Sequence, residues 1–395
     1  MDNLKLSILK SLYFSSPQSI AELSSSIGKS VPNITNSIHK LLQSDLIQQD
    51  GLAPSTGGRR AAQFIPNSQQ LPLIVCVAID QFYTSVVITD FKNEFQTEIS
   101  TQRIPLKGEN AYEELVAFIR QTMLLVQDKP IFGLGVSIPG FVDSKSGKNN
   151  SFTAESPFYD FQANLGKTFN LPVFIENDSS AIAIAEHYFG QAKDARNVMV
   201  VNLNWGVGLG MIIDNELYRG HSGYAGEFSH IPLSNQNKLC SCGKKGCLEV
   251  EASLIAAIEF ATEKLSKGEE SSLLKDYQQQ NNHITGDQLL TAANAGDQLA
   301  IEAISRIGYM LGKGIATLIH IINPEMVVVS GRGAQAKTIL APQINSALLE
   351  FTIQRLSKNT KIKFSNTKHI QLLGSACVCI GNSDKSIYKN YLTEI

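Results

Sequence analysis

The stretch Pro172-Val-Phe-Ile-Glu-Asn-Asp178, with the mainly apolar run that follows it over residues 179–189, decides the fold class. Its apolar β-branched and aromatic residues predict a buried strand, and the run after it predicts a helix. Further along, a helix is expected over Ile301–Ile322, ended by Asn-Pro, and Met326-Val-Val-Val-Ser330 has the pattern of another strand. Strands that alternate with helices indicate α/β architecture.

Other strand patterns surround these two segments. They cover Ile74–Ile79, Thr84–Asp90, Ile131–Ser137, Val198–Leu203 and Gly208–Ile213, and a helix is expected over Ala111–Gln127. The chain has 395 residues, of which 43% are hydrophobic and 18% charged, so it can form two or three packed domains and lacks the composition of a disordered protein.

The overall charge and the N-terminus exclude some classes of protein. A net charge of −2 argues against a polyelectrolyte binder, and the first residues lack the pattern of a signal peptide. The most apolar stretch, over residues 307–329, is interrupted by Lys, His, Asn, Pro and Glu. We therefore expect a cytoplasmic protein without membrane insertion.

Residues 1–70 differ from the rest of the chain because they carry an excess of basic residues. Helical spacing predicts a first helix over residues 4–14. Ser19-Ile-Ala-Glu22 has the pattern of a capping box that opens a second helix, which Gly28 ends. Ser30 is expected to cap a third helix with Pro32 in its first turn. Two short helices joined by a glycine turn predict a helix-turn-helix whose last helix enters the major groove.

A hairpin is expected after the third helix, from Leu46–Gly51 and Gln63–Ile65, with a Gly-Gly-Arg-Arg tip. Together with the third helix it predicts a winged DNA-binding domain, since glycines permit close approach to DNA and arginines bind phosphates or a narrow minor groove. The alternative is a helical protein-docking module with an exposed basic loop. The predicted DNA contacts are Ser30, Asn33, Thr35, Asn36, His39, Lys40, Arg59 and Arg60.

Three of the six cysteines are crowded into Cys240-Ser-Cys242-Gly-Lys-Lys-Gly-Cys247, ten residues after His230. In a large cytoplasmic chain this spacing favours a metal over disulfides. Three thiolates and one imidazole fill a tetrahedral zinc site completely, which predicts structural zinc. The alternative is a set of reduced surface cysteines with a histidine nearby by chance.

Asp178 lies where a predicted strand ends and a predicted helix begins. A carboxylate at the end of a parallel strand faces the edge of the sheet where such folds bind ligands. The same residue type also caps helices well without any chemistry. From the residues alone both roles stay open.

Several motifs in order and spacing resemble the ROK family of repressors and sugar kinases. They are Gly135-Val-Ser-Ile-Pro-Gly-Phe-Val-Asp143, Glu176-Asn-Asp178, Gly223-Tyr-Ala-Gly-Glu-Phe-Ser-His230 and the cysteine cluster ending in Leu248-Glu249. The resemblance covers about residues 70–395 and implies an actin-like, two-lobed fold with a sugar cleft. The N-terminal module is similar to that of the repressor branch.

The resemblance also implies site residues. Sugar contacts are expected from Gly140, Asn177, Asp178, Glu227, His230 and Glu249, and Asp178 matches the general base of the kinases. The phosphate-binding loop of the kinases departs here, because Asp80-Gln-Phe-Tyr-Thr84 places aromatics where that loop has glycines. Since phosphoryl transfer depends on positioning, we expect no catalytic residues and no kinase activity.

The predicted domains are a winged helix-turn-helix over residues 1–70 and a ROK sugar-binding domain over residues 71–395. Lobe I should cover about 71–190 plus the C-terminal helix, and lobe II about 191–375. The expected function is a sugar-responsive repressor, a homodimer or dimer of dimers that binds double-stranded operator DNA and is modulated by a sugar or sugar phosphate. The alternatives are an ATP-dependent sugar kinase with an appended DNA-binding domain and a repressor released by a regulatory protein partner.

Overall fold

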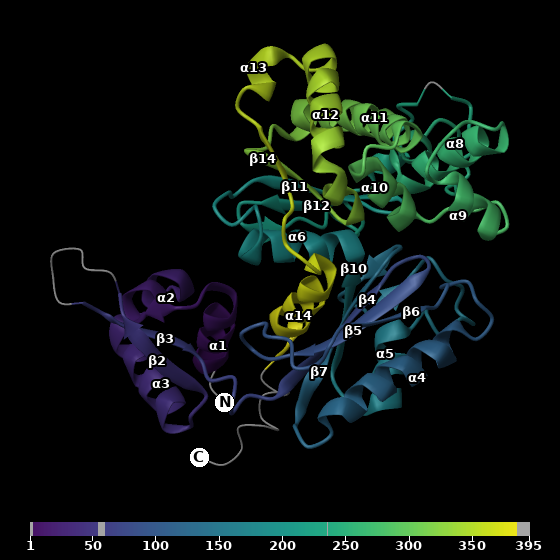
Figure 1. The fold of residues 1–395 in the computed structure, drawn as a ribbon. Helices are drawn as coiled ribbons and strands as arrows, with labels where there is room; N and C mark the ends of the chain where they lie inside the picture. The colour runs from purple at the N-terminus through teal and green to yellow at the C-terminus, as the bar shows by residue number, and fades with distance from the viewer. Residues whose placement is uncertain (1–2, 54–59, 235, 385–395) are drawn as a thin grey trace. The chain divides into compact units, whose positions relative to one another are not determined.

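The computed structural model describes residues 3–53, 60–234 and 236–384, and the chain divides into two compact units (Figure 1). Unit 1 runs to Ala181 and resumes at Gln371, and unit 2 spans Ile182–Ile370. The chain therefore passes between the units twice. The first passage lies within α6 (Asp178–Phe189), and the second lies at the start of α14 (Ile370–Asn382).

Unit 1 begins with three helices and a small antiparallel sheet. These are α1 (Asn3–Ser15), α2 (Ile20–Ile27) and α3 (Val31–Gln43), with strands in the order β1 (Gln18–Ser19), β3 (Ala62–Pro66) and β2 (Ile47–Leu52). The predicted capping box is confirmed: the Ser19 side chain accepts from the Glu22 amide, and the Glu22 carboxylate accepts from the Ser19 amide. Ser30 is the N-cap residue of α3, but its side chain makes no capping hydrogen bond. The short strand β1 was not predicted.

The body of unit 1 is a five-stranded sheet in the order β10-β7-β4-β5-β6. Its strands are β4 (Leu73–Ile79), β5 (Tyr83–Thr89), β6 (Ser100–Arg103), β7 (Ile131–Ile138) and β10 (Val173–Asn177). Between β7 and β10 the chain also forms a separate two-stranded ribbon of β8 (Val142–Asp143) and β9 (Lys148–Asn149). Residues at alternate positions of the strands pack on α4 (Ala111–Met123) and α5 (Phe161–Phe169). The opposite face holds α14, as Figure 1 shows.

Unit 2 repeats the same strand order around β11 (Val198–Leu203). Its other strands are β12 (Val207–Ile213), β13 (Glu216–Leu217), β14 (Met326–Ser330) and β15 (Lys361–Phe364). In both units the first strand is central, the second and third continue antiparallel on one side, and the fourth and fifth run parallel to it on the other. The predicted α/β class is confirmed.

Helices cover the sheet of unit 2, and the long helix α11 forms the centre of its core. They are α7 (Glu249–Ala252), α8 (Leu254–Ser266), α9 (Leu274–Gln279), α10 (Gly286–Asn294), α11 (Gln298–Ile322), α12 (Lys337–Phe351) and α13 (Gln354–Ser357). The predicted start of α11 at Ile301 was three residues late, because Asp297 caps the helix by accepting from the Ala300 amide at 2.9 Å. None of the helices in the described residues combines the length and apolar character that a bilayer-spanning segment requires.

Candidate metal centre and binding residues

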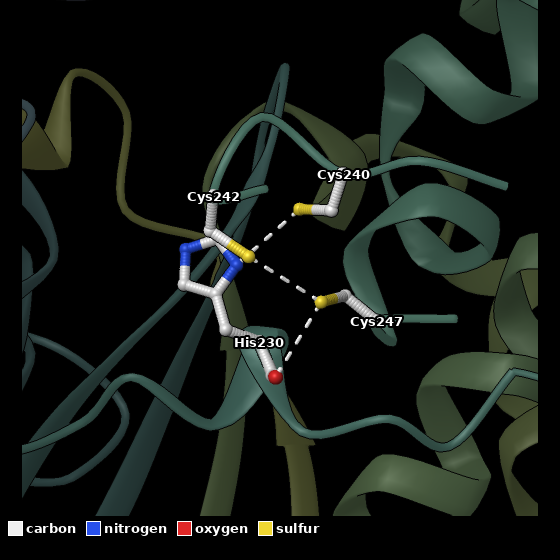
Figure 2. A group of neighbouring side chains, drawn as sticks. All are labelled: His230, Cys240, Cys242 and Cys247. Carbon is white, nitrogen blue, oxygen red and sulfur yellow. Dashed lines mark hydrogen bonds between the residues drawn. The ribbon is translucent and has the colours of Figure 1, made fainter. Parts of the chain in front are cut away.

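Four potential metal ligands converge within unit 2 (Figure 2). His230 ends the short helix η2 (Phe228–His230), and the three cysteines lie on the loop that precedes α7. One ligand atom from each of His230, Cys240, Cys242 and Cys247 lies within 4.8 Å of all the others. The structure thus brings together the four residues that the sequence spacing singled out.

The distances fit a tetrahedral ion. The Sγ atoms of Cys242 and Cys247 are 3.6 Å apart, and the Sγ atom of Cys240 is 3.5 Å from Nδ1 of His230. Around Zn²⁺ with ordinary bond lengths, two sulfurs lie about 3.8 Å apart and a sulfur and a nitrogen about 3.5 Å apart. The side chains present therefore match a closed, four-coordinate site.

The backbone of the loop holds the cysteines in place. The amide of Cys240 donates to the carbonyl of Lys244 at 2.8 Å, and the amide of Gly243 donates to the carbonyl of Cys240 at 2.9 Å. A hydrogen bond from the Lys244 amide lowers the pKa of Cys242, whereas burial raises the pKa of Cys247 to about 12. A divalent cation deprotonates coordinating thiols, so it would hold both as thiolates.

His230 uses its two ring nitrogens in different directions. Nδ1 faces the sulfur cluster, and Nε2 lies 3.6 Å from Oε2 of Glu227. A carboxylate on the second nitrogen orients a metal-bound histidine and fixes its tautomer. Burial raises the pKa of Glu227, with a smaller contribution from the nearby carboxylate of Glu249 and an opposing one from His230.

Glu249 joins the metal cluster to the loop between β11 and β12. Its Oε1 atom lies 4.0 Å from the Sγ atom of Cys240, and a Cβ atom on Gly206 would be 2.8 Å from its Oε2 atom. Of the predicted sugar-binding residues, His230 therefore belongs to this cluster, and Glu227 and Glu249 are its neighbours within unit 2.

The other three predicted sugar-binding residues belong to unit 1. Asn177, and not Asp178, caps α6: its Oδ1 atom accepts from the amides of Ser179 and Ser180 at 3.0 and 3.1 Å. Asp178 is the first residue of the helix, and its carboxylate accepts from the Ser179 hydroxyl at 3.3 Å. The capping role left open for Asp178 is filled by its neighbour. The sugar contact stays a prediction.

Gly140 lies beside Asn177, which donates from Nδ2 to the Gly140 carbonyl at 3.1 Å. Its φ of +112° and the 2.5 Å between a built Cβ atom and the Ser151 hydroxyl explain the glycine through the fold of this loop. Its contact with a ligand stays a prediction. The six residues thus form two local groups, one in each unit.

The turn over residues 80–84, where the sequence predicts the loss of the kinase phosphate loop, is held by hydrogen bonds within itself. Oδ1 of Asp80 accepts from the amides of Phe82 and Tyr83, both at 2.7 Å, and the Asp80 amide donates to the Tyr83 carbonyl at 2.8 Å. Two amides of this turn are thus directed at the Asp80 carboxylate, and Phe82 and Tyr83 are half-buried.

The chain's single tryptophan is packed into unit 2, in a cluster that the sequence did not indicate. The Trp205 ring is 6% exposed, and a Cβ atom on Gly286 would lie 2.8 Å from it. The guanidinium of Arg332 lies 5.2 Å from the ring centroid and is paired with Asp287 at 3.2 Å. Arg332 lies far in sequence from both of its partners, Trp205 and Asp287. No local sequence pattern therefore identified this cluster of three residues.

The predicted DNA contacts on α3 are largely accessible. Ser30, Asn33, Asn36, His39 and Lys40 are exposed, while Ile34, Ile38 and Leu41 are buried on the opposite face. Thr35 is half-buried, and its hydroxyl donates to the Val31 carbonyl at 2.8 Å. The helix therefore presents polar and basic side chains to solvent along one side.

Arg60 lies at the base of the hairpin and bonds to its backbone. Its Nε and Nη2 atoms donate to the carbonyls of Ala53 and Leu52 at 2.8 and 2.9 Å. These bonds hold the two strands together where they leave the sheet. The predicted contact Arg59, with the rest of the tip over residues 54–59, lies outside the described residues.

The repeated strand order in the two units defines a two-lobed α/β protein with a sugar-kinase-like fold. The model of the ROK family matches residues 76–380, and the chain belongs to this family. The predicted resemblance is confirmed.

Relatives and solved structures agree with this assignment. The chain is 28% identical over 389 residues to the xylose repressor of Bacillus spizizenii, covering 96% of this chain and 94% of that protein. It is 29% identical over 360 residues to the N-acetylglucosamine repressor of Escherichia coli O157:H7, covering 90% and 86%. A ROK family transcriptional regulator, a homologue of the E. coli Mlc protein, superimposes with a TM-score of 0.75 at 25% identity over 96% of both chains. A ROK glucokinase from Streptomyces griseus gives a TM-score of 0.66 at 23% identity, covering 77% of this chain and 98% of that one.

Proposed function

We propose that this chain is a sugar-responsive, DNA-binding transcriptional repressor of carbohydrate genes, acting in the cytoplasm. One observation carries the proposal. The matches to a repressor and to a transcriptional regulator each extend over 96% of this chain. The match to the glucokinase takes in 98% of the glucokinase but only 77% of this chain. The model of the ROK family matches residues 76–380 and leaves the helical module at the N-terminus outside the match. A DNA-binding function therefore accounts for residues that a sugar kinase does not need.

The N-terminal module is proposed to be a winged helix-turn-helix. Its support is the exposed polar side of α3, which suits base edges in the major groove, and the hairpin β2–β3 that follows it. Palindromic operators mirror protein dimers, so we propose a homodimer or a dimer of dimers. The small net positive charge of residues 1–70 suits few phosphate contacts and a moderate salt dependence of binding.

We propose a structural zinc ion held by His230, Cys240, Cys242 and Cys247. A zinc ion with four protein ligands contributes folding energy and orders the loop that carries them. Because His230 also contacts Glu227, this loop positions a residue of the proposed sugar-binding set.

The effector is proposed to be a sugar or sugar phosphate bound by Gly140, Asn177, Asp178, Glu227, His230 and Glu249. Carboxylates and amides suit polyols because each can pair with adjacent hydroxyls. The effector changes operator binding only if it has different affinities for the DNA-binding and the released states. No phosphoryl transfer is proposed, because the amides of Phe82 and Tyr83 already donate to the Asp80 carboxylate and because the bulky Trp205 is buried in the loop between β11 and β12.

The test begins with selection of bound fragments from sheared genomic DNA by the purified full-length chain, followed by anisotropy on the enriched duplex. D-xylose, N-acetylglucosamine, its 6-phosphate and D-glucose are then added in turn. We expect a recurring palindrome and a change in its affinity with one sugar, with no consumption of ATP. Absence of any enriched sequence would contradict the repressor function, and ATP-dependent phosphorylation of a sugar would support a kinase instead.

We expect Asp178→Asn to weaken the binding of the sugar while leaving the affinity for the operator unchanged. The substitution keeps the shape of the side chain but removes the charge that accepts from a hydroxyl, which corresponds to a loss of about 10- to 100-fold in sugar affinity. Calorimetric titration with the sugar identified above measures it. Asp128→Asn, on an exposed loop of the same unit, is the matched control. Equal affinities for Asp178→Asn and the wild type would remove Asp178 from the binding set.

A further inference from the structure

Helix α14 lies against the sheet of unit 1, at positions where the strand opposite it has glycines. A Cβ atom on Gly135 would be 1.8 Å from the Ser375 carbonyl, and one on Gly133 would be 3.5 Å from the sulfur of Cys379. The Ser375 hydroxyl donates to the Val77 carbonyl at 2.9 Å, and Gln371 donates to that of Ile79 at 3.0 Å. Because α14 packs this closely on the sheet, it has little freedom to move relative to the sheet.

The C-terminal end of α14 is bound by the first helix of the N-terminal module. The Nζ atom of Lys10, on α1, donates to the carbonyls of Gly381 and Ser383 at 2.7 and 2.6 Å. The last carbonyls of a helix have no partner within the helix and carry its partial negative charge, so an ammonium group is favourable there. Lys10 is thus a C-terminal cap supplied from 371 residues away.

Tyr13, one turn further along α1, makes the second contact with the body of unit 1. Its ring is 2% exposed and packs edge-on against Phe91 with centroids 6.2 Å apart. Its hydroxyl donates to Oδ1 of Asn93 at 2.7 Å and lies within hydrogen-bonding reach of the thiol of Cys377 on α14. Cys377 is 1% exposed.

The position of α14 in the chain gives these contacts a consequence. The chain returns from unit 2 to unit 1 at Ile370 and Gln371, where α14 begins. One end of this helix therefore follows the passage between the units directly, and its other end holds α1. The peptide link from β3 to β4, over residues 67–72, connects the N-terminal module to the body along the chain.

We propose that α14 is the element through which sugar binding controls the DNA-binding module, and that Lys10 is the residue that positions this module on it. This inference rests on the proposed repressor function. A change between the units at residue 370 moves α14 together with the sheet on which it is seated, and the contacts of Lys10 and Tyr13 make α1 follow. Without those contacts, the module keeps its fold and its DNA-binding surface but no longer follows the helix.

The first test needs neither DNA nor sugar. Alkylation of Cys377 by N-ethylmaleimide, mapped by mass spectrometry, reports how often α1 and α14 separate. We expect Lys10→Met to speed alkylation about tenfold or more, because two hydrogen bonds from a charged group are lost. Lys5→Met is the matched control: it removes the same charge from α1, and within the described residues Lys5 makes no hydrogen bond or ion pair. Lys10→Arg should restore slow alkylation.

The second test uses the enriched operator and the sugar panel. We expect Lys10→Met to bind the operator within about threefold of wild type, since Lys10 lies on α1 and not on α3, while the change in affinity caused by the sugar falls about tenfold. Tyr13→Phe keeps the ring and loses the hydroxyl, so it should reduce the response to the sugar by a smaller factor. It replaces Lys10→Met in this test if Lys10→Met does not fold.

The outcomes separate the two proposals. Unchanged alkylation in Lys10→Met, or faster alkylation with an undiminished sugar response, would overturn the role of α14. A wild-type chain that selects no DNA or does not respond to any sugar would instead refute the repressor function, and the alkylation rates would still decide whether Lys10 holds the helices together.

Discussion

The Cys247→Ser variant is expected to lose its zinc and to melt about 10 °C below the wild type. The Cys247 sulfur is fully buried and lies 3.6 Å from that of Cys242, so no solvent ligand can take its place without opening the loop. Loss of a structural metal is among the few single changes that cost more than about 4 kcal/mol, and a domain of this size loses about 2–4 °C for each kcal/mol.

Elemental analysis and calorimetry on the same preparation provide the measurement. The wild type should hold about one zinc per chain, and the variant less than a tenth of that. Ser241→Ala is the matched control, since it alters an exposed side chain between two of the ligands. A wild-type chain that is purified without zinc and is not stabilised by added zinc would contradict the assignment of the cluster.

The double variant Asn33→Ala/Asn36→Ala is expected to bind the operator about 100- to 1,000-fold more weakly than the wild type. Both amides are exposed on the same side of α3, and each bidentate pair between an asparagine and a base contributes about 1–3 kcal/mol of discrimination. Binding to unrelated duplexes should change little, because phosphate contacts dominate there.

Fluorescence anisotropy with the enriched duplex and a scrambled one measures both affinities. Gln43→Ala, an exposed change at the end of the same helix, is the matched control for helix stability. If the double variant keeps the operator affinity, α3 does not read the bases, and the protein-docking alternative for this module gains support.

Local patterns predicted the features whose physics is local. The capping box at Ser19 and Glu22 depends on residues three apart, and the strand Met326–Ser330 depends on a continuous apolar run, so both were visible in the sequence. The four proposed metal ligands were visible too, because three of them lie within eight residues. Their spacing is set by the tight turns of a loop, which leave little choice of geometry.

Where two neighbouring residues could fill the same structural role, only the structure showed which of them does. Asn177 and Asp178 are both good helix caps, and the choice between them depends on where β10 ends against β7. The short strand β1 was missed for a related reason, because two residues form a strand only when a partner such as β3 is already in place.

The sequence by itself determined the α/β class, the positions of most strands, the family and the four residues of the His/Cys cluster, because each depends on periodicity or on short motifs. Only the tertiary structure decided that both units share one strand order, that Arg332 covers Trp205 and that Lys10 caps α14. Such contacts join residues tens to hundreds of positions apart, and long-range packing, to which local propensity contributes nothing, selects them.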